Sequence, residues 1–154
     1  MDFERSLAAV SVNADVADVL RELCDVTGMG FAAVAGMTDN RWMAFQVFDR
    51  IEFGLNAGAE LDIAATICNE IRESGRPIYI DSVRDAEKWR NHPVPAIYGF
   101  QSYVSTPLFR MNRTVYGTMF AVDPQPQIID TPEIRKVIGL LAARMMTCIY
   151  PDAI

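Results

Sequence analysis

The chain has 154 residues, of which 51% are hydrophobic and 22% charged, and its formal net charge is −6 with a pI near 4.7. This composition is ordinary for a compact domain with a sizeable core, so we expect residues 1–154 to form a single domain. An acidic chain without a Lys or Arg cluster lacks the basic face that nucleic acids and anionic membranes bind, which argues against both partners. The N-terminus carries acidic residues and no signal-like hydrophobic segment, which predicts a cytoplasmic protein.

The first apolar stripe has the three- and four-residue spacing of a helix. Its members are Val12, Val16, Val19, Leu20 and Leu23. Asn13 is placed to cap the helix and Gly28 to end it, which predicts a helix over 13–27, with a shorter helix before it.

A β-hairpin is predicted next, with strands over 31–35 and 42–48 and a turn at 38–40. Residues 49–61 contain spaced glycines and no clear period, so we expect a short strand and a mobile loop there.

The middle of the chain combines one helix with an irregular stretch. Asp62 is placed to cap a helix that carries Ile63, Ile67 and Ile71 on one face and ends at Ser74 and Gly75. The short β-prone run at 77–80 predicts an inner strand. Residues 81–97 are expected to form one or two helical turns around 85–90, because the prolines that follow forbid continuation. Long irregular segments within compact domains often bind ligands.

A second hairpin is predicted over 98–123, with strands that are apolar on both faces and a turn at 110–113 closed by a left-handed Asn112. Thr131 and Pro132 then begin a long amphipathic helix over 131–150, which Pro151 is expected to end.

This order of elements predicts an α+β fold, with an antiparallel sheet covered by helices. The sequence resembles a GAF domain, on the strand GFQSYVSTPL at 99–108 and the strand VYGTM at 115–119. The resemblance implies a small-molecule sensing module with a central antiparallel sheet, the two terminal helices on one face and a ligand pocket on the other.

The residues do not favour an enzyme. His92 is the single histidine, no phosphate loop or nucleophile motif is present, and the three cysteines are widely spaced on predicted helix faces, where buried free thiols are expected. One GAF subfamily reduces free methionine sulfoxide with cysteines beside its pocket, and phytochrome-like members attach a linear tetrapyrrole through a cysteine. Neither matching position holds a cysteine here, so both activities remain as alternatives only.

A pocket is predicted between the sheet and the 81–98 segment, because aromatic and polar side chains gather there. The candidate ligand-binding residues are Asp81, Trp89, His92, Tyr98, Phe100, Gln101, Tyr103 and Ser105. His92 and Gln101 are expected to donate or accept hydrogen bonds, and the irregular backbone favours a small polar or anionic ligand. Trp42 and Phe53 are candidates for the other wall, although a core role is the preferred interpretation.

The predicted function is therefore that of a stand-alone GAF sensory domain that binds a small molecule non-covalently and signals through a partner protein. The ligand and any cofactor stay open, a bound linear tetrapyrrole being the first alternative and a thiol reductase the second. A homodimer through the terminal helices is also expected. The apolar cluster Met145, Met146, Cys148 and Ile149 predicts this interface.

Overall fold

The computed structural model describes residues 1–62 and 67–153, and of the last four of these it describes the backbone alone. Six strands form one antiparallel sheet in the order β3-β2-β1-β6-β5-β4. The strands are β1 (Phe31–Met37), β2 (Trp42–Asp49), β3 (Glu60–Leu61), β4 (Ile78–Ile80), β5 (Ser102–Phe109) and β6 (Val115–Asp123). Both predicted hairpins and the α+β class are confirmed.

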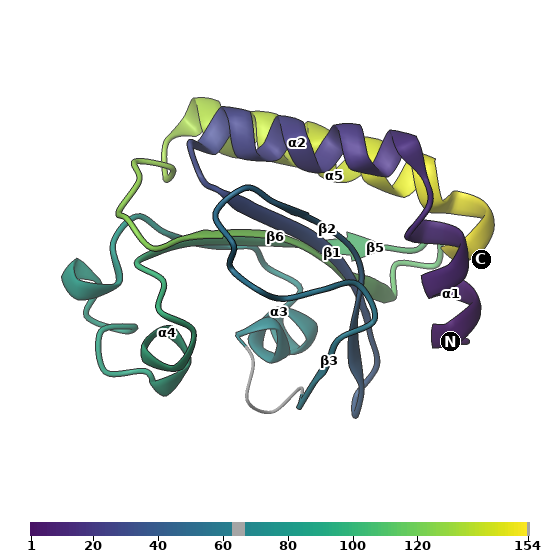
Figure 1. The fold of residues 1–154 in the computed structure, drawn as a ribbon, viewed down its shortest axis with the longest axis horizontal. Coiled ribbons are helices and arrows are strands. Elements are labelled where there is room, and N and C mark those ends of the chain that lie inside the picture. Colours follow the sequence, from purple (N-terminus) through teal and green to yellow (C-terminus); the bar gives the residue numbers. More distant parts are fainter. Residues whose placement is uncertain (63–66, 154) are drawn as a thin grey trace.

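The terminal helices lie together along one face of the sheet (Figure 1). These are α2 (Ala14–Thr27) and α5 (Pro132–Ala153), with the short α1 (Phe3–Val10) beside them. The Asn13 side chain accepts hydrogen bonds from two amides of the first turn of α2, and its amide group donates to the Cys148 carbonyl of α5 at 3.2 Å. Arg144 of α5 forms an ion pair with Glu22 of α2. The predicted pairing of these helices is confirmed.

Strand alternation divides the core into two clusters, because successive side chains of a strand point to opposite faces. The helix-side core lies under α2 and α5 and includes Val16, Leu20, Leu23, Cys24, Ala32, Val34, Val104, Met119, Ile138 and Met145. The cavity-side core lies on the opposite face and includes Phe31, Trp42, Cys68, Ile71, Ile80, Val94, Phe100, Tyr103, Phe120 and Val122. At the sheet centre Gly117 of β6 is required, since a Cβ there would lie 1.8 Å from the Ala35 carbonyl oxygen of β1.

Short elements cover the cavity-side core (Figure 1): α3 (Cys68–Ser74), a 3₁₀ turn (Val83–Asp85) and α4 (Pro93–Tyr98). The predicted end of α3 at Gly75 is confirmed by its left-handed conformation. The described helix begins at Cys68. The predicted Ile63 and the rest of 63–66 lie outside the described residues.

One prediction for this region is wrong, and another is incomplete. Among the described strands the run at 77–80 forms an edge strand, β4, which pairs with β5, because the 81–101 segment turns back over the sheet face instead of adding another strand. The helical turns predicted around 85–90 are present and end before Pro93, but the prolines then begin a further helix that was not predicted. Pro93 occupies the first position of α4 and Pro95 the third, where no intrahelical N–H bond is lost.

Three local predictions elsewhere also need correction. In the β5–β6 turn Arg113 takes the positive φ of 69°, while the Asn112 side chain accepts a hydrogen bond from the Thr114 amide. Val12 is 81% exposed, because α2 begins only after the Asn13 cap. Helix α5 continues through Pro151 to Ala153, since a proline in the last turn removes only one backbone bond.

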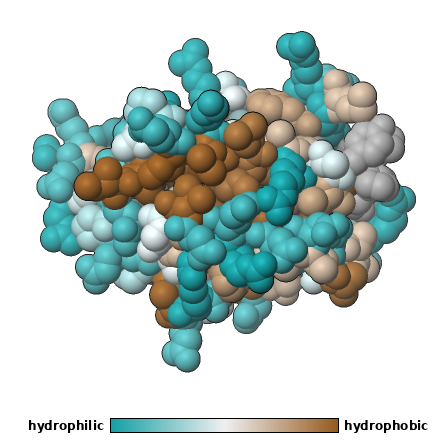
Figure 2. Space-filling view, turned by 90° about the horizontal axis from the view of Figure 1, so that it is seen from above, coloured by the Kyte–Doolittle hydropathy of each residue, from teal (hydrophilic) through white to brown (hydrophobic). Residues whose placement is uncertain are grey.

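The outer surface of the helical face carries a band of apolar side chains (Figure 2). Met145 and Ile149 do not contribute to it, because both are buried in the helix-side core, so this part of the dimer argument is wrong. Leu140 of α5 is 63% exposed, and Val137 and Met146 are partly exposed. Among the helices described, none is both long and apolar enough to cross a membrane.

Candidate ligand-binding site

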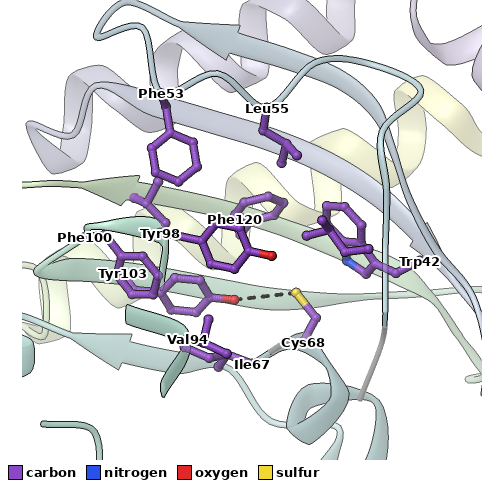
Figure 3. A pocket seen from close by; sticks show the side chains of 12 residues that line it. Trp42, Phe53, Leu55, Ile67, Cys68, Val94, Tyr98, Phe100, Tyr103 and Phe120 are labelled. Carbon is purple, nitrogen blue, oxygen red and sulfur yellow. Dashed lines mark hydrogen bonds between the residues drawn. The ribbon is translucent and has the colours of Figure 1, made fainter. Parts of the chain in front are cut away.

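A cavity of about 60 Å³ lies between the cavity-side face of the sheet and the short elements that cover it (Figure 3). Its described lining comes from β2, the β2–β3 loop, β3, the start of α3, α4, the α4–β5 loop, β5 and β6. These residues are Trp42, Phe53, Leu55, Leu61, Ile67, Cys68, Val94, Tyr98, Phe100, Tyr103, Phe120 and Val122. No charged side chain belongs to this described lining.

Aromatic rings from the sheet form the floor of the cavity. Tyr103 of β5 stacks against Phe100 with ring centroids 5.4 Å apart, and against Phe120 of β6 at 6.4 Å. The Trp42 ring lies 5.8 Å from that of Phe120. Phe120 pairs with Ser105 across β5 and with Ala33 across β1, so a small neighbour on β1 leaves room for the ring cluster.

The polar atoms of the cavity gather at one end. The Cys68 Sγ lies 3.5 Å from the Tyr103 hydroxyl, and the Tyr98 hydroxyl also points into the cavity (Figure 3). The Trp42 indole nitrogen lies on the ring edge that faces Cys68 (Figure 3), close enough to lower the pKa of the thiol, but this N–H makes no hydrogen bond among the described residues. Trp42 is only 1% exposed, so water does not solvate this donor freely.

Burial keeps both Cys68 and Tyr103 in their neutral forms at physiological pH. Burial raises the pKa of the Cys68 thiol, although the Tyr103 hydroxyl and, more weakly, the Trp42 N–H act in the opposite direction. Burial also raises the pKa of Tyr103 well above its usual value, and the charge of a Cys68 thiolate would act in the same direction. The cavity thus offers neutral donors rather than charges.

Tyr98, Phe100 and Tyr103 are the predicted site residues that line the cavity. Trp42 and Phe53, for which a core role was preferred, also line the cavity. The Phe53 ring packs on Phe31 at 4.8 Å, so the same side chain serves the core and the wall.

Trp89 and His92 lie outside the described lining and contact each other, with ring centroids 5.3 Å apart. Trp89 is buried under the 86–92 turns, and Lys88 lies 4.8 Å over its ring. His92 is the N-cap of α4, because its Nδ1 accepts a hydrogen bond from the Val94 amide at 3.2 Å. These contacts position α4, whose Val94 and Tyr98 do reach the cavity.

The other predicted site residues also bond elsewhere. The Asp81 carboxylate accepts hydrogen bonds from the Ile129 and Asp130 amides at 2.9 and 2.8 Å, next to the start of α5. The Gln101 side chain accepts one from the Arg84 amide at 3.1 Å. The Ser105 hydroxyl is buried in the sheet and bonds to Thr118, and it also lies close enough to Cys68 and Tyr103 to lower the pKa of each. Asp81, Gln101 and Ser105 are thus outside the described lining, although Ser105 lies behind its polar end.

Sequence reasoning missed Cys68 and Val94 as lining residues. Cys68 was assigned to a helix stripe with Ile67 and Ile71, and all three are buried, but Ile67 and Cys68 begin the helix and face the cavity. The buried tyrosine could have pointed to such a residue, because the phenol hydroxyl of a tyrosine in a buried strand requires a polar partner. Val94 lies between two prolines, in a segment for which an irregular backbone was predicted, so it was not recognised as a lining residue.

The other two cysteines also have raised thiol pKa values, so little of the reactive thiolate forms at neutral pH. Cys24 belongs to the helix-side core, and burial raises its pKa from 9.0 to about 11. Burial also raises the pKa of Cys148. Among the residues that the structure describes, no group of three His, Cys, Asp or Glu side chains is arranged to hold a metal ion.

Comparison with protein families agrees with this geometry, because the family model described as "GAF domain" matches residues 12–149. The chain belongs to the GAF domain family. GAF domains are small-molecule sensing and signalling modules and are generally sensory rather than catalytic. No curated protein matches the sequence.

Solved GAF structures share the fold at low sequence identity. The GAF domain of a sensor histidine kinase from Bacillus halodurans is 14% identical, with a TM-score of 0.71 over 94% of this chain and 97% of that one. The GAF domain of an Acinetobacter phosphoenolpyruvate-protein phosphotransferase is 12% identical, with a TM-score of 0.69 over 96% of this chain and 90% of that one. The chromophore-binding domain of a bacteriophytochrome from R. palustris is 12% identical, with a TM-score of 0.74 over 96% of this chain and 57% of that one.

Proposed function

We propose that this GAF domain binds a small aromatic molecule in the cavity on the α3/α4 face and signals through the opposite, helical face. The observation that carries the proposal is the aromatic, uncharged lining of a cavity whose outer wall, at Phe53, Leu55 and Tyr98, is partly exposed to solvent. Pockets of this kind, apolar with a few polar groups, are typical of small-molecule sites. The lining favours an apolar ligand over the polar or anionic one expected from the sequence, because nothing in it compensates a buried charge.

The size of the cavity favours a small ligand. Drug-sized ligands occupy pockets of about 300–1,000 Å³, and an apolar cavity of about 150 Å³ accepts benzene. A cavity of about 60 Å³ must widen to accept even one ring. The half-buried Leu55 lies in a loop without regular structure, and its side chain can move without disturbing the sheet. A linear tetrapyrrole requires a far larger rearrangement, and we therefore place it second.

Binding is tested by thermal unfolding and calorimetry with indole, p-cresol and cumene as probes. A probe at ten times its Kd adds about 1.4 kcal/mol to the stability of the folded state, which raises the Tm by roughly 3–6 °C for a chain of this size. Val94→Phe fills the cavity and is expected to abolish the shift. Ile97→Phe, on the same helix at a site 69% exposed and outside the described lining, is the matched control. No shift with any probe at millimolar concentration contradicts the proposal.

The signalling half of the proposal concerns the apolar band on the helical face. Leu140, Val137 and Met146 leave apolar surface on α5 that the core does not use, which supports a homodimer or a partner protein bound there. The raised pKa values of the buried thiols support a sensory rather than a reductase role, because the thiolate is the reactive form. Visible absorption of the purified protein would instead support the tetrapyrrole alternative.

A further inference from the structure

The indole N–H of Trp42 is a buried donor that faces the Cys68 sulfur. Trp42 is 1% exposed and lines the cavity, and its Nε1 has no hydrogen-bond partner among the described residues. Buried polar groups in folded proteins are nearly always bonded, since an unsatisfied donor carries the full loss of its hydration. An orphaned donor in the wall of a cavity is therefore a place where a ligand gains affinity by supplying an acceptor.

The groups around this donor are neutral and can also donate. The Cys68 thiol and the Tyr103 hydroxyl lie 3.5 Å apart at the same end of the cavity. Burial raises the pKa of both groups, so each keeps its proton at neutral pH. The Tyr98 hydroxyl points toward the same end from α4 (Figure 3). A ligand atom at this end therefore meets several donors and no formal charge.

An anionic acceptor does not fit this end. No Lys, Arg or His belongs to the described lining, and burying an uncompensated anion costs far more than a hydrogen bond returns. The Glu70 carboxylate of α3 contributes to the raised pKa of Tyr103, so it also disfavours a second negative charge there. The acceptor must therefore belong to a neutral group.

We propose that the ligand is a neutral aromatic molecule that carries a carbonyl or similar acceptor, and that Trp42 Nε1 donates the hydrogen bond that orients it. The inference rests on the proposed function and makes it specific. The ring packs on Phe120 and Tyr103, while its acceptor atom lies at the end formed by Trp42 and Cys68. Trp42 is thus the specificity-determining residue of the cavity.

The test compares three probes by calorimetry at pH 7: acetophenone, cumene and benzoate. Cumene has a methyl group in place of the carbonyl oxygen of acetophenone, and benzoate is anionic. The ratio of the cumene Kd to the acetophenone Kd is expected to fall about tenfold in Trp42→Phe, since the difference in hydrophobicity between the probes cancels in this comparison. Trp89→Phe, which changes the chain's other tryptophan outside the described lining, should leave the ratio unchanged. Benzoate should not compete with acetophenone.

An NMR measurement on the wild-type protein keeps the test decisive if Trp42→Phe does not fold. The chain has two tryptophans, so its ¹⁵N spectrum has two indole signals, and Trp89→Phe assigns them. Acetophenone is expected to move the Trp42 indole proton downfield relative to cumene, because hydrogen bonding deshields it while ring-current effects are common to both probes.

The failure of this inference differs from that of the proposed function. If both probes bind with an unchanged ratio in Trp42→Phe, or with equal shifts of the indole proton, the cavity binds aromatic molecules but Trp42 does not select them. Competition by benzoate would overturn the requirement for a neutral ligand. If neither probe binds at millimolar concentration, the proposed function fails and the inference fails with it.

Discussion

The two faces of the sheet are covered in different ways. The helix-side core lies beneath α2, of 14 residues, and α5, of 22 residues, and is built mainly from aliphatic side chains. The cavity-side core lies beneath α3, of 7 residues, and α4, of 6 residues, and is rich in aromatic rings. Long amphipathic helices bury a continuous stripe, whereas short elements leave gaps between large rings.

The two faces therefore also differ in how completely their groups are packed and hydrogen-bonded. The helical face contains closely packed groups, and its capping side chains all have partners in the structure. The cavity face contains an empty volume and an unsatisfied donor, both of which lower stability and both of which a ligand can use. Changes of the same kind on the two faces should therefore have unequal effects.

The largest effect is expected from a pair of leucines. Leu20→Ala removes a fully buried side chain from the helix-side core and should lower the free energy of unfolding by about 3 kcal/mol. Leu55→Ala shortens a half-buried wall residue and should cost less than about 1 kcal/mol. Urea unfolding measures both. Equal losses would mean that the cavity face is packed as closely as the helical one.

Alkaline pH tests the packing around Cys24. Its folded pKa of about 11 exceeds the unfolded value of 9.0, so its contribution is complete below pH 9 and is lost as the pH rises toward 11. Over that interval the unfolded chain releases the proton first, and the free energy of unfolding should fall by about 1 kcal/mol per pH unit from this group. Cys24→Ala should show a shallower decline in urea unfolding at pH 9–10.5. A parallel decline would place the Cys24 thiol in contact with water.

Two of the helix N-caps allow a smaller comparison. Asn13 caps α2 and also donates to Cys148 of α5, so Asn13→Ala should cost about 1 kcal/mol. His92 caps only the short α4 through Val94, and His92→Ala should cost about 0.5 kcal/mol. Because His92 lies outside the described lining, its removal should leave the affinity for cumene within about threefold. A tenfold loss of affinity would return His92 to the binding site.

The smallest effect on stability is expected at the outer surface of α5. Leu140 is 63% exposed, so Leu140→Glu should change the free energy of unfolding by less than about 0.5 kcal/mol. If this face forms the proposed homodimer, the same change should shift the mass from dimer to monomer in light scattering at tens of micromolar. Met111→Glu, in the β5–β6 turn at a site 82% exposed, should leave the mass unchanged. A wild-type monomer would refute the dimer.

The sequence predicted the helical face better than the cavity face. The α2 cap at Asn13, the left-handed Gly28 and the start of α5 at Pro132 are set by local chemistry that the sequence states directly. The pairing of α2 and α5 was predicted because each helix carries one apolar stripe, and both stripes must be buried against a shared surface. The residues that α5 exposes were predicted incorrectly, because Met145 and Ile149 are buried in the helix-side core.

The cavity face depends on contacts between distant segments, which a single sequence does not encode locally. The edge position of β4 follows from the path of the chain after Asp81, and the prolines of α4 are compatible with either a helix start or a loop. The cavity itself combines Trp42 of β2 with Cys68 of α3 and Tyr103 of β5, residues widely separated along the chain. Their aromatic and polar types were visible, but their convergence was not.

Asp81 joins the two faces at the β4 edge of the sheet. Its carboxylate holds the Ile129 and Asp130 amides, its carbonyl oxygen accepts from the Gln127 amide, and Arg135 of α5 lies 4.3 Å over the Tyr79 ring of β4. The strand that begins the cavity-covering segment is therefore fastened to the residues just before α5 and to the first turn of that helix. A displacement of that segment by a ligand would therefore act on α5 at its N-terminus, where a small shift is amplified along the length of the helix.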